Sequence, residues 1–376
     1  MKQIELIEKP EEKLRSFENI AKCPYCSGKI VKRGVRKKKF EEVQIYYCKN
    51  CDKRFTSQIT KNKTYPLRII LDTLTFYNKL YSYEEIGNLI ENKYGITLSS
   101  RIISRWIEEH KTYLPFLRMR EFVIKNYKRK ELIEESKLIH QQIYNFKFHR
   151  AKLDLILGEE FRHFKFKPLK EFLELVLSEC PHQIFREKQE RASEKKEEFN
   201  LNEVKIVSKK SSASKFANFV IQAVLNNKER HEVLEEFMFY NDSVTVAVEV
   251  PVLLDADDIS HYKFELGFQI PFSINDGKYI TGHIDLIQIR NGSIYIMDYK
   301  PSAKKEKPIE QLTIYALALS RLTGIRLYHF KCVWFDSKDY FEFFPLHVVY
   351  KKKKDKINKN QMRLSLREKE VIKNED

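Results

Sequence analysis

The 376-residue sequence contains no run of about 20 apolar residues, which is the length that a helix needs to cross a membrane. An apolar segment is also missing behind the charged N-terminus, MKQIELIEKPEEKLRSF, where a secretory signal would carry one. These two absences predict a cytoplasmic protein with no membrane partner.

Acidic residues are too few to balance the basic ones, since 69 lysines and arginines face 53 aspartates and glutamates, a formal charge of +16. This excess favours a polyanionic partner, and nucleic acid is the simplest one. Because soluble proteins with an unusual composition can also be rich in lysine, the charge needs support from motifs. The length is enough for two or three domains, each with its own core.

Cysteine is scarce but strongly patterned. Four of the six cysteines form two C-x-x-C pairs: Cys23 with Cys26 and Cys48 with Cys51. In a protein without a secretory signal such pairs favour zinc over disulfides. The stretch between them contains two short strand patterns, KIVKRG and VQIYY, so a hairpin would bring the four thiolates around a tetrahedral Zn²⁺. This pattern predicts a structural zinc ribbon over residues 20–57, with no open position for catalysis.

The loop of this ribbon is basic and carries six candidate phosphate contacts: Lys32, Arg33, Arg36, Lys37, Lys38 and Lys39. Such a run is often only a solvated surface. On a rigid zinc hairpin next to a helical DNA-binding unit, however, it favours contact with phosphates.

Residues 64–112 repeat apolar side chains at helical spacing in three segments. Ser82 and Glu85 form a capping-box pattern, and Gly95 and Ser99 mark a short turn before the last segment. This arrangement predicts a helix-turn-helix, the alternative being a generic three-helix bundle. The third helix would bury Ile102, Ile103, Trp106 and Ile107. Its outward side chains would face a DNA major groove: Arg101, Ser104, Arg105 and Glu108. The ribbon and these helices together resemble the N-terminal half of insertion-sequence transposases, although no D…D…E catalytic pattern follows.

Asn291-Gly292 joins two alternating apolar segments and predicts a two-residue β-hairpin. In the resulting register Asp285 lies opposite Asp298, and Lys300 projects the same way. That face also carries four isoleucines: Ile287, Ile289, Ile294 and Ile296. Two carboxylates this close on an apolar face repel each other unless a cation lies between them, so the hairpin predicts an Mg²⁺ site suited to phosphodiester hydrolysis. The alternative is an edge hairpin with ordinary surface ion pairs.

Three patterns around this hairpin occur together: Gly282-His283-Ile284-Asp285, Asp298-Tyr299-Lys300, and Gln311 with Tyr315 on the helix expected at 308–322. They resemble the RecB-like branch of the PD-(D/E)XK nucleases. The resemblance implies an α/β fold with a mixed-sheet, restriction-endonuclease-like core over residues 215–350.

The resemblance also implies roles for individual residues. Asp285 and Asp298 would bind Mg²⁺ or Mn²⁺, with the Tyr299 carbonyl as a third ligand, and Lys300 would orient the attacking water. Glu249, on a strand expected near 243–253, would hold the metal or its water shell.

Gln311 and Tyr315 would position the nucleic-acid strand, the other interpretation being the polar rim of an amphipathic helix.

Many members of this nuclease branch carry a metal-binding histidine on an early helix, and His231 is the nearest candidate, although a single helical histidine is more often structural. Some relatives hold an iron–sulfur cluster through four cysteines. Because only Cys180 and Cys332 lie outside the ribbon, we expect no cluster here.

Three further segments complete the predicted organisation: a mainly helical connector at 113–185, a charged linker at 186–214 and a basic tail at 351–376. Strands are expected near 262–272, 279–290, 293–300, 326–336 and 341–348. The whole pattern predicts a metal-dependent DNA endonuclease, and cutting both strands would need two cores, as in a homodimer. Three alternatives remain open: a DNA-binding regulator without activity, a transposase-like recombination protein, and a nuclease that acts on RNA.

Overall fold

The structure is a computed structural model that describes residues 14–16, 23, 26, 28–37, 40–56, 64–159, 161–195, 199–201, 204–224 and 227–350. Lys38, Lys39 and the predicted basic tail at 351–376 lie outside the described residues. None of the helices in the described ranges has the length and apolar character that would let it cross a membrane.

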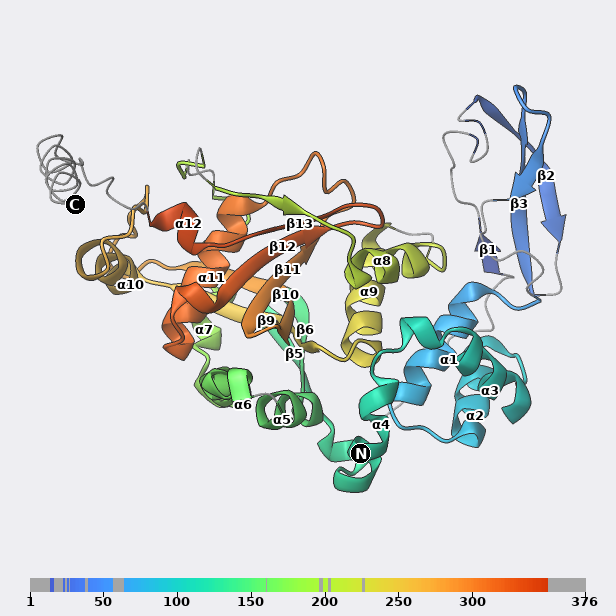
Figure 1. Cartoon of the computed structure of the whole chain (residues 1–376), viewed down its shortest axis with the longest axis horizontal. Coiled ribbons are helices and arrows are strands. Elements are labelled where there is room, and N and C mark those ends of the chain that lie inside the picture. The colour runs from blue at the N-terminus through green and yellow to red at the C-terminus, as the bar shows by residue number, and fades with distance from the viewer. Residues whose placement is uncertain are drawn as a thin grey trace, which may run out of the picture.

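A small four-stranded sheet stands at one end of the molecule (Figure 1). Its strands are β1 (Leu14–Ser16), β2 (Ile30–Lys37), β3 (Glu41–Cys48) and β4 (Arg54–Thr56). β3 lies in the centre, antiparallel to β2 and β4 and parallel to β1. The two strands expected between the C-x-x-C pairs are therefore present as β2 and β3.

Three helices follow at the predicted places: α1 (Leu67–Asn78), α2 (Tyr83–Tyr94) and α3 (Ser100–Glu109). The capping box of α2 is formed, because Glu85 N donates to Ser82 Oγ at 3.2 Å and Ser82 N donates to a Glu85 carboxylate oxygen at 2.7 Å. Gly95 ends α2 in the left-handed region with φ 63°. Three of the four side chains expected to be buried in α3 are buried, namely Ile103, Trp106 and Ile107, whereas Ile102 is only partly buried.

The central element is a nine-stranded mixed sheet with the order β5-β6-β9-β10-β11-β12-β13-β8, with β7 added alongside β10. The strand bounds are β5 (Ile133–His140), β6 (Gln142–His149), β7 (Glu190–Arg191), β8 (Val207–Ser208), β9 (Thr245–Leu254), β10 (Ile280–Arg290), β11 (Ser293–Tyr299), β12 (Phe330–Phe335) and β13 (Tyr340–Phe343). β11 and β12 run parallel, whereas β9, β10 and β11 are antiparallel neighbours. The mixed sheet agrees with the predicted fold class.

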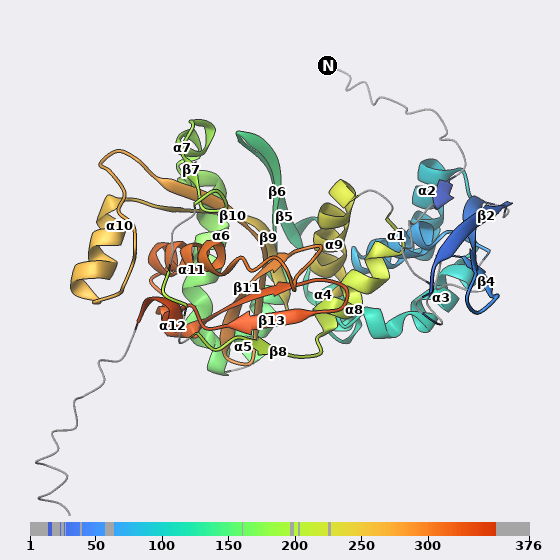
Figure 2. The ribbon, with the colours of Figure 1, turned by 90° about the horizontal axis from the view of Figure 1, so that it is seen from above.

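Helices cover this sheet on both sides because its strands are apolar on both faces. One core packs α5 (Arg150–Glu159), α6 (Lys167–Glu179) and α11 (Ile309–Thr323) against residues such as Ile294 and Ile296. The other packs α1–α3, α8 (Ser212–Ile221) and α9 (Asn227–Asn241) against residues such as Met297 and Phe335. Figure 2 shows α8 and α9 between the sheet and α1.

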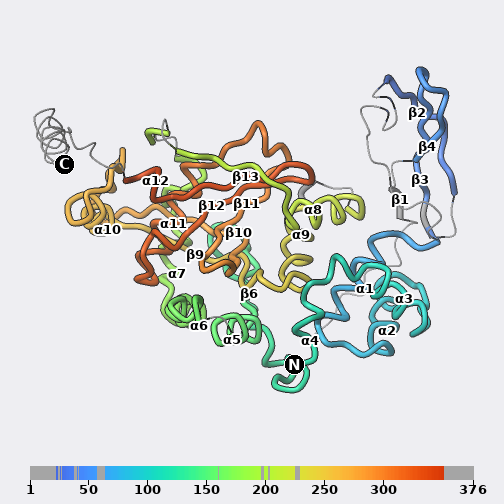
Figure 3. Tube along the Cα trace, in the orientation of Figure 1, coloured from blue at the N-terminus to red at the C-terminus, as the bar shows by residue number. Residues whose placement is uncertain are grey.

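The remaining helices are short or peripheral: α4 (Leu117–Asn126), α7 (His182–Arg186), α10 (Ala256–Ser260) and α12 (Leu346–Val349). Along the trace in Figure 3, α10 lies at the end of the molecule opposite the small sheet. α4 leads from the N-terminal helices into β5, so the chain enters the large sheet directly after them.

Three sequence-based expectations about secondary structure need correction. The segment 113–185 is mainly helical as expected, but its residues 133–149 form the β5–β6 hairpin, which joins the large sheet through β9. Tyr144, Phe146 and Phe148 alternate with more exposed residues at the period of two typical of strands, and this pairing overrides the helix propensity of the surrounding lysines and glutamates.

The segment 186–214 is also more than a linker, since β7 and β8 pair with β10 and β13 and α8 begins at Ser212. The strand expected at 262–272 is absent from this described segment. Asp255 caps α10 by accepting from Asp258 N at 2.8 Å, and a π-helical turn, His261–Glu265, continues from it. A strong N-cap therefore directs this stretch into helix.

Candidate active site and metal centres

The hairpin between β10 and β11 has the predicted turn and register. Asn291 and Gly292 have φ angles of 51° and 68°, the double left-handed conformation of a type I′ turn. The pairs then run outward from Arg290↔Ser293 to Leu286↔Met297. Asp285 and Asp298 are the next residues on the two strands, so the turn sets them opposite each other.

Asp298 is buried, with 3 % of its surface exposed, and its Oδ2 lies 2.9 Å from Lys300 Nζ. Burial and then the charge of Asp285 raise the pKa of Asp298 to about 8, although Lys300 opposes this shift. Burial likewise raises the pKa of Asp285, and His231 opposes it. The two carboxyl groups therefore share one low-dielectric site in which a single ammonium does not neutralise both.

His231 and Glu235, one turn apart on α9, complete a cluster with Asp285 whose candidate ligand atoms all lie within 4.8 Å of one another. His231 Nε2 donates to the Tyr299 carbonyl at 2.7 Å, while Nδ1 lies 3.1 Å from a Glu235 oxygen and 3.7 Å from Asp285 Oδ2. Burial alone would lower the pKa of His231, but Glu235 and Asp285 raise it to about 10. The imidazolium thus stands among three oxygen acceptors.

Glu249 lies on β9 between Val248 and Val250, which pair with Leu286 and Ile284, so it is opposite Asp285. Its φ of 52° is in the left-handed region, where residues with side chains are uncommon. Burial, then the charges of Glu235 and Asp285, raise its pKa to about 9. A strained glutamate facing further carboxylates is typical of a functional site.

Gln311 and Tyr315 lie one turn apart on α11, and Gln311 Nε2 donates to Tyr315 Oη at 3.0 Å. The Tyr315 ring packs directly on Gly282, because a Cβ added there would lie 2.2 Å from Tyr315 Cε1. Burial and then the Asp285 charge raise the pKa of Tyr315. The glycine of the G-x-x-D pattern therefore admits the tyrosine of α11 beside Asp285.

All six residues predicted to form the catalytic site come from four neighbouring elements: Glu249 from β9, Asp285 from β10, Asp298 and Lys300 from β11 and its end, and Gln311 and Tyr315 from α11. Sequence reasoning missed Glu235 and gave His231 little weight. The spacing of four residues between them puts both on one helix face and was the available signal.

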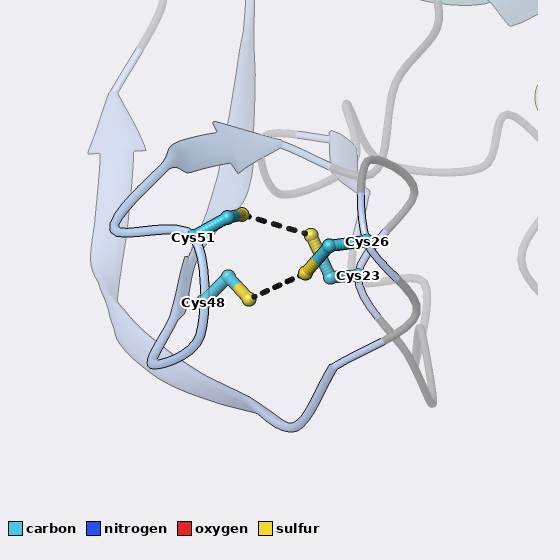
Figure 4. Close-up of side chains that lie close together, drawn as sticks. All are labelled: Cys23, Cys26, Cys48 and Cys51. Carbon is cyan, nitrogen blue, oxygen red and sulfur yellow. Dashed lines mark hydrogen bonds between the residues drawn. The ribbon is translucent and has the colours of Figure 1, made fainter.

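The four N-terminal cysteines also converge (Figure 4). Cys23 Sγ lies 3.7 Å from Cys51 Sγ, and Cys26 Sγ lies 3.4 Å from Cys48 Sγ. Tetrahedral zinc with Zn–S bonds of about 2.3 Å requires sulfur–sulfur distances of about 3.8 Å. Burial would raise the pKa of Cys48, but backbone N–H groups of Cys51 and Asn50 lower it to about 6, which favours a thiolate. The donor set fits a structural zinc ion.

The residues predicted to contact DNA are exposed and lie on two elements. Arg33, Arg36 and Lys37 are on β2, and Arg101, Ser104 and Arg105 are on α3. Their contact with DNA stays a prediction.

Residues 173–364, just over half of the chain, match the family model of the PD-(D/E)XK nuclease superfamily. The chain belongs to this superfamily. No curated protein and no solved structure matches the chain. PD-(D/E)XK proteins are generally nucleases that hydrolyse phosphodiester bonds with divalent metals, and the matched segment includes the whole cluster of acidic residues described above.

The PD-(D/E)XK site of this chain fits a divalent cation. Among the residues that the structure describes, Asp285 Oδ2 is buried without a hydrogen-bond partner. Carboxylates and a carbonyl are also ligands that Mg²⁺ and Mn²⁺ prefer, and the His231 imidazole could join them once it loses its proton. Asp285, Asp298, Glu235, His231 and the Tyr299 carbonyl are the groups available to hold such an ion.

Proposed function

We propose that the chain is a metal-dependent DNA endonuclease of the RecB-like branch, with an N-terminal zinc ribbon and helix-turn-helix that bind the DNA. The observation that carries the proposal is the convergence of Asp285, Asp298 and Lys300 with His231 on one buried site. Superfamily membership alone supports only a nuclease.

In this proposal Asp285 and Asp298 hold Mg²⁺ or Mn²⁺, together with His231 and the Tyr299 carbonyl. The bound cation supplies Lewis acidity toward the phosphate and lowers the pKa of a water molecule. The Lys300 ammonium is fixed by Asp298 at 2.9 Å, so it can orient the attacking water and offset phosphate charge.

Other side chains position the substrate and the acidic cluster. Gln311 and Tyr315 form one hydrogen-bonded unit beside Asp285, where a DNA strand would pass. Glu235 orients His231 through the contact at 3.1 Å, as carboxylates commonly do for metal-binding histidines. A bound divalent cation would lower the raised pKa of Glu249, and the carboxylate formed would then favour a divalent ion over a monovalent one.

The N-terminal part would supply binding energy. Zn²⁺ on Cys23, Cys26, Cys48 and Cys51 would hold β2 and β3 together, since a structural zinc site contributes folding energy directly. Exposed cations on β2 and α3 would then contact phosphates and base edges. This module is the reason for proposing DNA over RNA.

The test is cleavage of plasmid DNA by the full chain in Mg²⁺ or Mn²⁺. Asp298→Ala should reduce the rate by at least about a hundredfold, since it removes both a metal ligand and the fixed position of Lys300. Asp276→Ala is the matched control, because Asp276 is an exposed aspartate outside the site. Equal cleavage by wild type and Asp298→Ala would refute the nuclease proposal and favour a DNA-binding regulator. Joined instead of cut products would favour recombination.

A further inference from the structure

Arg191 lies next to the strand that carries Asp285, in the segment that the sequence presented as a linker. It is the second residue of β7, which runs parallel to β10 with Ile280 opposite Glu190 and Thr281 opposite Arg191. Ala192 N also donates to the Thr281 carbonyl at 2.9 Å. These contacts hold the backbone of Arg191 one residue from Gly282, where the G-x-x-D pattern begins.

The Arg191 side chain is held by a stack of buried rings. Arg191 Nη2 donates to Tyr144 Oη at 2.6 Å. The Tyr144 ring lies flat on His283, with centroids 3.5 Å apart and planes 6° apart, and the nearest ring nitrogens of His283 and His140 are 2.8 Å apart. Tyr144, His283 and His140 are all buried, so the phenol is a fixed anchor for the guanidinium.

Arg191 forms no ion pair with a carboxylate among the residues that the structure describes, since the neighbouring Glu190 pairs with Lys195, and Arg191 is only partly buried. A guanidinium has five N–H donors, and the bond to Tyr144 uses one of them. The remaining donors form a planar fork that matches a phosphate group.

Arg191 and the acidic site both influence the same two tyrosines. Burial raises the pKa of Tyr144 most, the Arg191 charge lowers it, and Glu249 and Asp285 raise it. Burial raises the pKa of Tyr315 most, Asp285 and Asp298 raise it further, and Arg191 lowers it. Two phenols on different elements therefore lie within the fields of both the acidic site and this guanidinium.

We propose that Arg191 binds a backbone phosphate of the substrate strand that neighbours the phosphate to be cut. The proposal rests on the proposed nuclease function and adds a substrate contact from β7. Four residues separate Thr281 from Asp285, which is about 13 Å of strand. At that backbone separation from Asp285, Arg191 would meet a neighbouring phosphate, and the scissile phosphate would be left to Lys300.

The test compares Arg191→Gln with Arg191→Lys and wild type in the full chain, using a fluorescent DNA duplex with Ca²⁺ in place of Mg²⁺, across a salt series. Arg191→Gln should weaken binding about tenfold, as expected for one charge-assisted contact. It should also reduce the slope of log affinity against log salt by about 0.9, the value for one phosphate on a duplex. Arg191→Lys should keep the wild-type slope, because it keeps the charge.

Two controls separate phosphate contact from a merely structural role. Arg162→Gln removes an exposed arginine at the other end of β10, beside Gly292, and should leave the slope unchanged. Tyr144→Phe keeps the ring but removes the hydroxyl that holds Arg191, so it should cost much less than Arg191→Gln.

An unchanged salt slope in Arg191→Gln would overturn the proposal. So would an equal loss in Arg162→Gln or in Tyr144→Phe, because the effect would then come from charge in general or from the Tyr144 hydroxyl and not from a phosphate contact of Arg191. A wild-type chain that binds the duplex but never cuts it in Mg²⁺ or Mn²⁺ would overturn the proposed nuclease function, and the binding slopes would still decide the role of Arg191.

Discussion

Replacing Gly282 by alanine gives a sharp test of how the α11 tyrosine reaches the acidic site. A Cβ at this position would lie 2.2 Å from Tyr315 Cε1 and 3.0 Å from Cζ, and both atoms belong to a rigid ring. Since Tyr315 is 5 % exposed, the ring cannot simply swing into solvent. Either β10 or α11 must shift.

Overpacking of this kind costs about 1–3 kcal/mol, which for a large domain lowers the melting temperature by several degrees. The shift also moves Tyr315 and its partner Gln311 away from Asp285, so the cleavage rate should fall more than stability does. We expect a folded Gly282→Ala protein with a lowered melting temperature and at least about tenfold slower cutting.

Gly158→Ala is the matched control, because a Cβ at Gly158 on α5 meets nothing within 4 Å. It should leave cutting unchanged and stabilise the chain by up to about 1 kcal/mol, since alanine favours helix. The double variant Gly282→Ala/Tyr315→Ala should be less destabilised than the sum of its single variants, because the clash is gone. Additive losses, or a Gly282→Ala protein that melts and cuts like wild type, would refute the packing argument.

Two further predictions concern metal and pH. Cys48→Ser should lose zinc, measured by metal analysis, and DNA binding, measured by gel shift, while thermal melting of the large sheet persists; retention of the wild-type zinc content would contradict the ribbon. Lys152 is buried, and Lys152 Nζ donates to the carbonyls of Phe239 and Thr245. Burial lowers its pKa from 10.5 to about 7, so between these values the unfolded state binds more protons and stability rises with pH. The unfolding free energies of wild type and Lys152→Met are compared in urea titrations at pH 7.5 and at pH 9. From the lower to the higher pH, wild type should gain stability relative to Lys152→Met, by at most about 1.4 kcal/mol per pH unit. A difference independent of pH would contradict a neutral buried amine.

The parts of the site that could be predicted from sequence are those fixed by local chemistry. A type I′ turn demands residues that tolerate positive φ, and Asn291-Gly292 is the standard pair for it, so the turn determined every pair up to Leu286↔Met297. The same reasoning held for α2, where Ser82 and Glu85 mark the start and Gly95 the end. In each case the signal and its consequence lie within a dozen residues.

What could not be predicted depends on contacts between distant segments. β5 and β6 become strands because β6 pairs with β9, which lies about 100 residues later, and no local pattern in the sequence indicates that pairing. β7 is only two residues long, so its sequence shows no strand periodicity, and it becomes a strand only by pairing with β10. Glu235 gains a role only because α9 lies beside the middle of β10 and the end of β11, next to Asp285 and Tyr299.

The position of α9 has a consequence for how the two halves of the chain work together. Its one face carries His231 and Glu235 to the acidic site, while Glu236 on the same helix lies 2.9 Å from Lys79 at the end of α1. At its C-terminal end, Asn241 accepts from Asn78 at 2.8 Å.

The apolar core is equally continuous. Leu74 of α1, Phe237 of α9 and Met297 of β11 belong to one buried cluster, which means that the N-terminal helices and the catalytic sheet are not joined by a loose tether. A closely packed core transmits displacements because it cannot deform without opening voids. If DNA displaces α1, the contacts at Lys79 and Asn78 would pull on α9, and the histidine that faces Asp285 would move with it. The sequence suggested a DNA-binding unit followed by a separate nuclease, whereas the packing of α9 makes the position of the candidate metal-binding histidine depend on both.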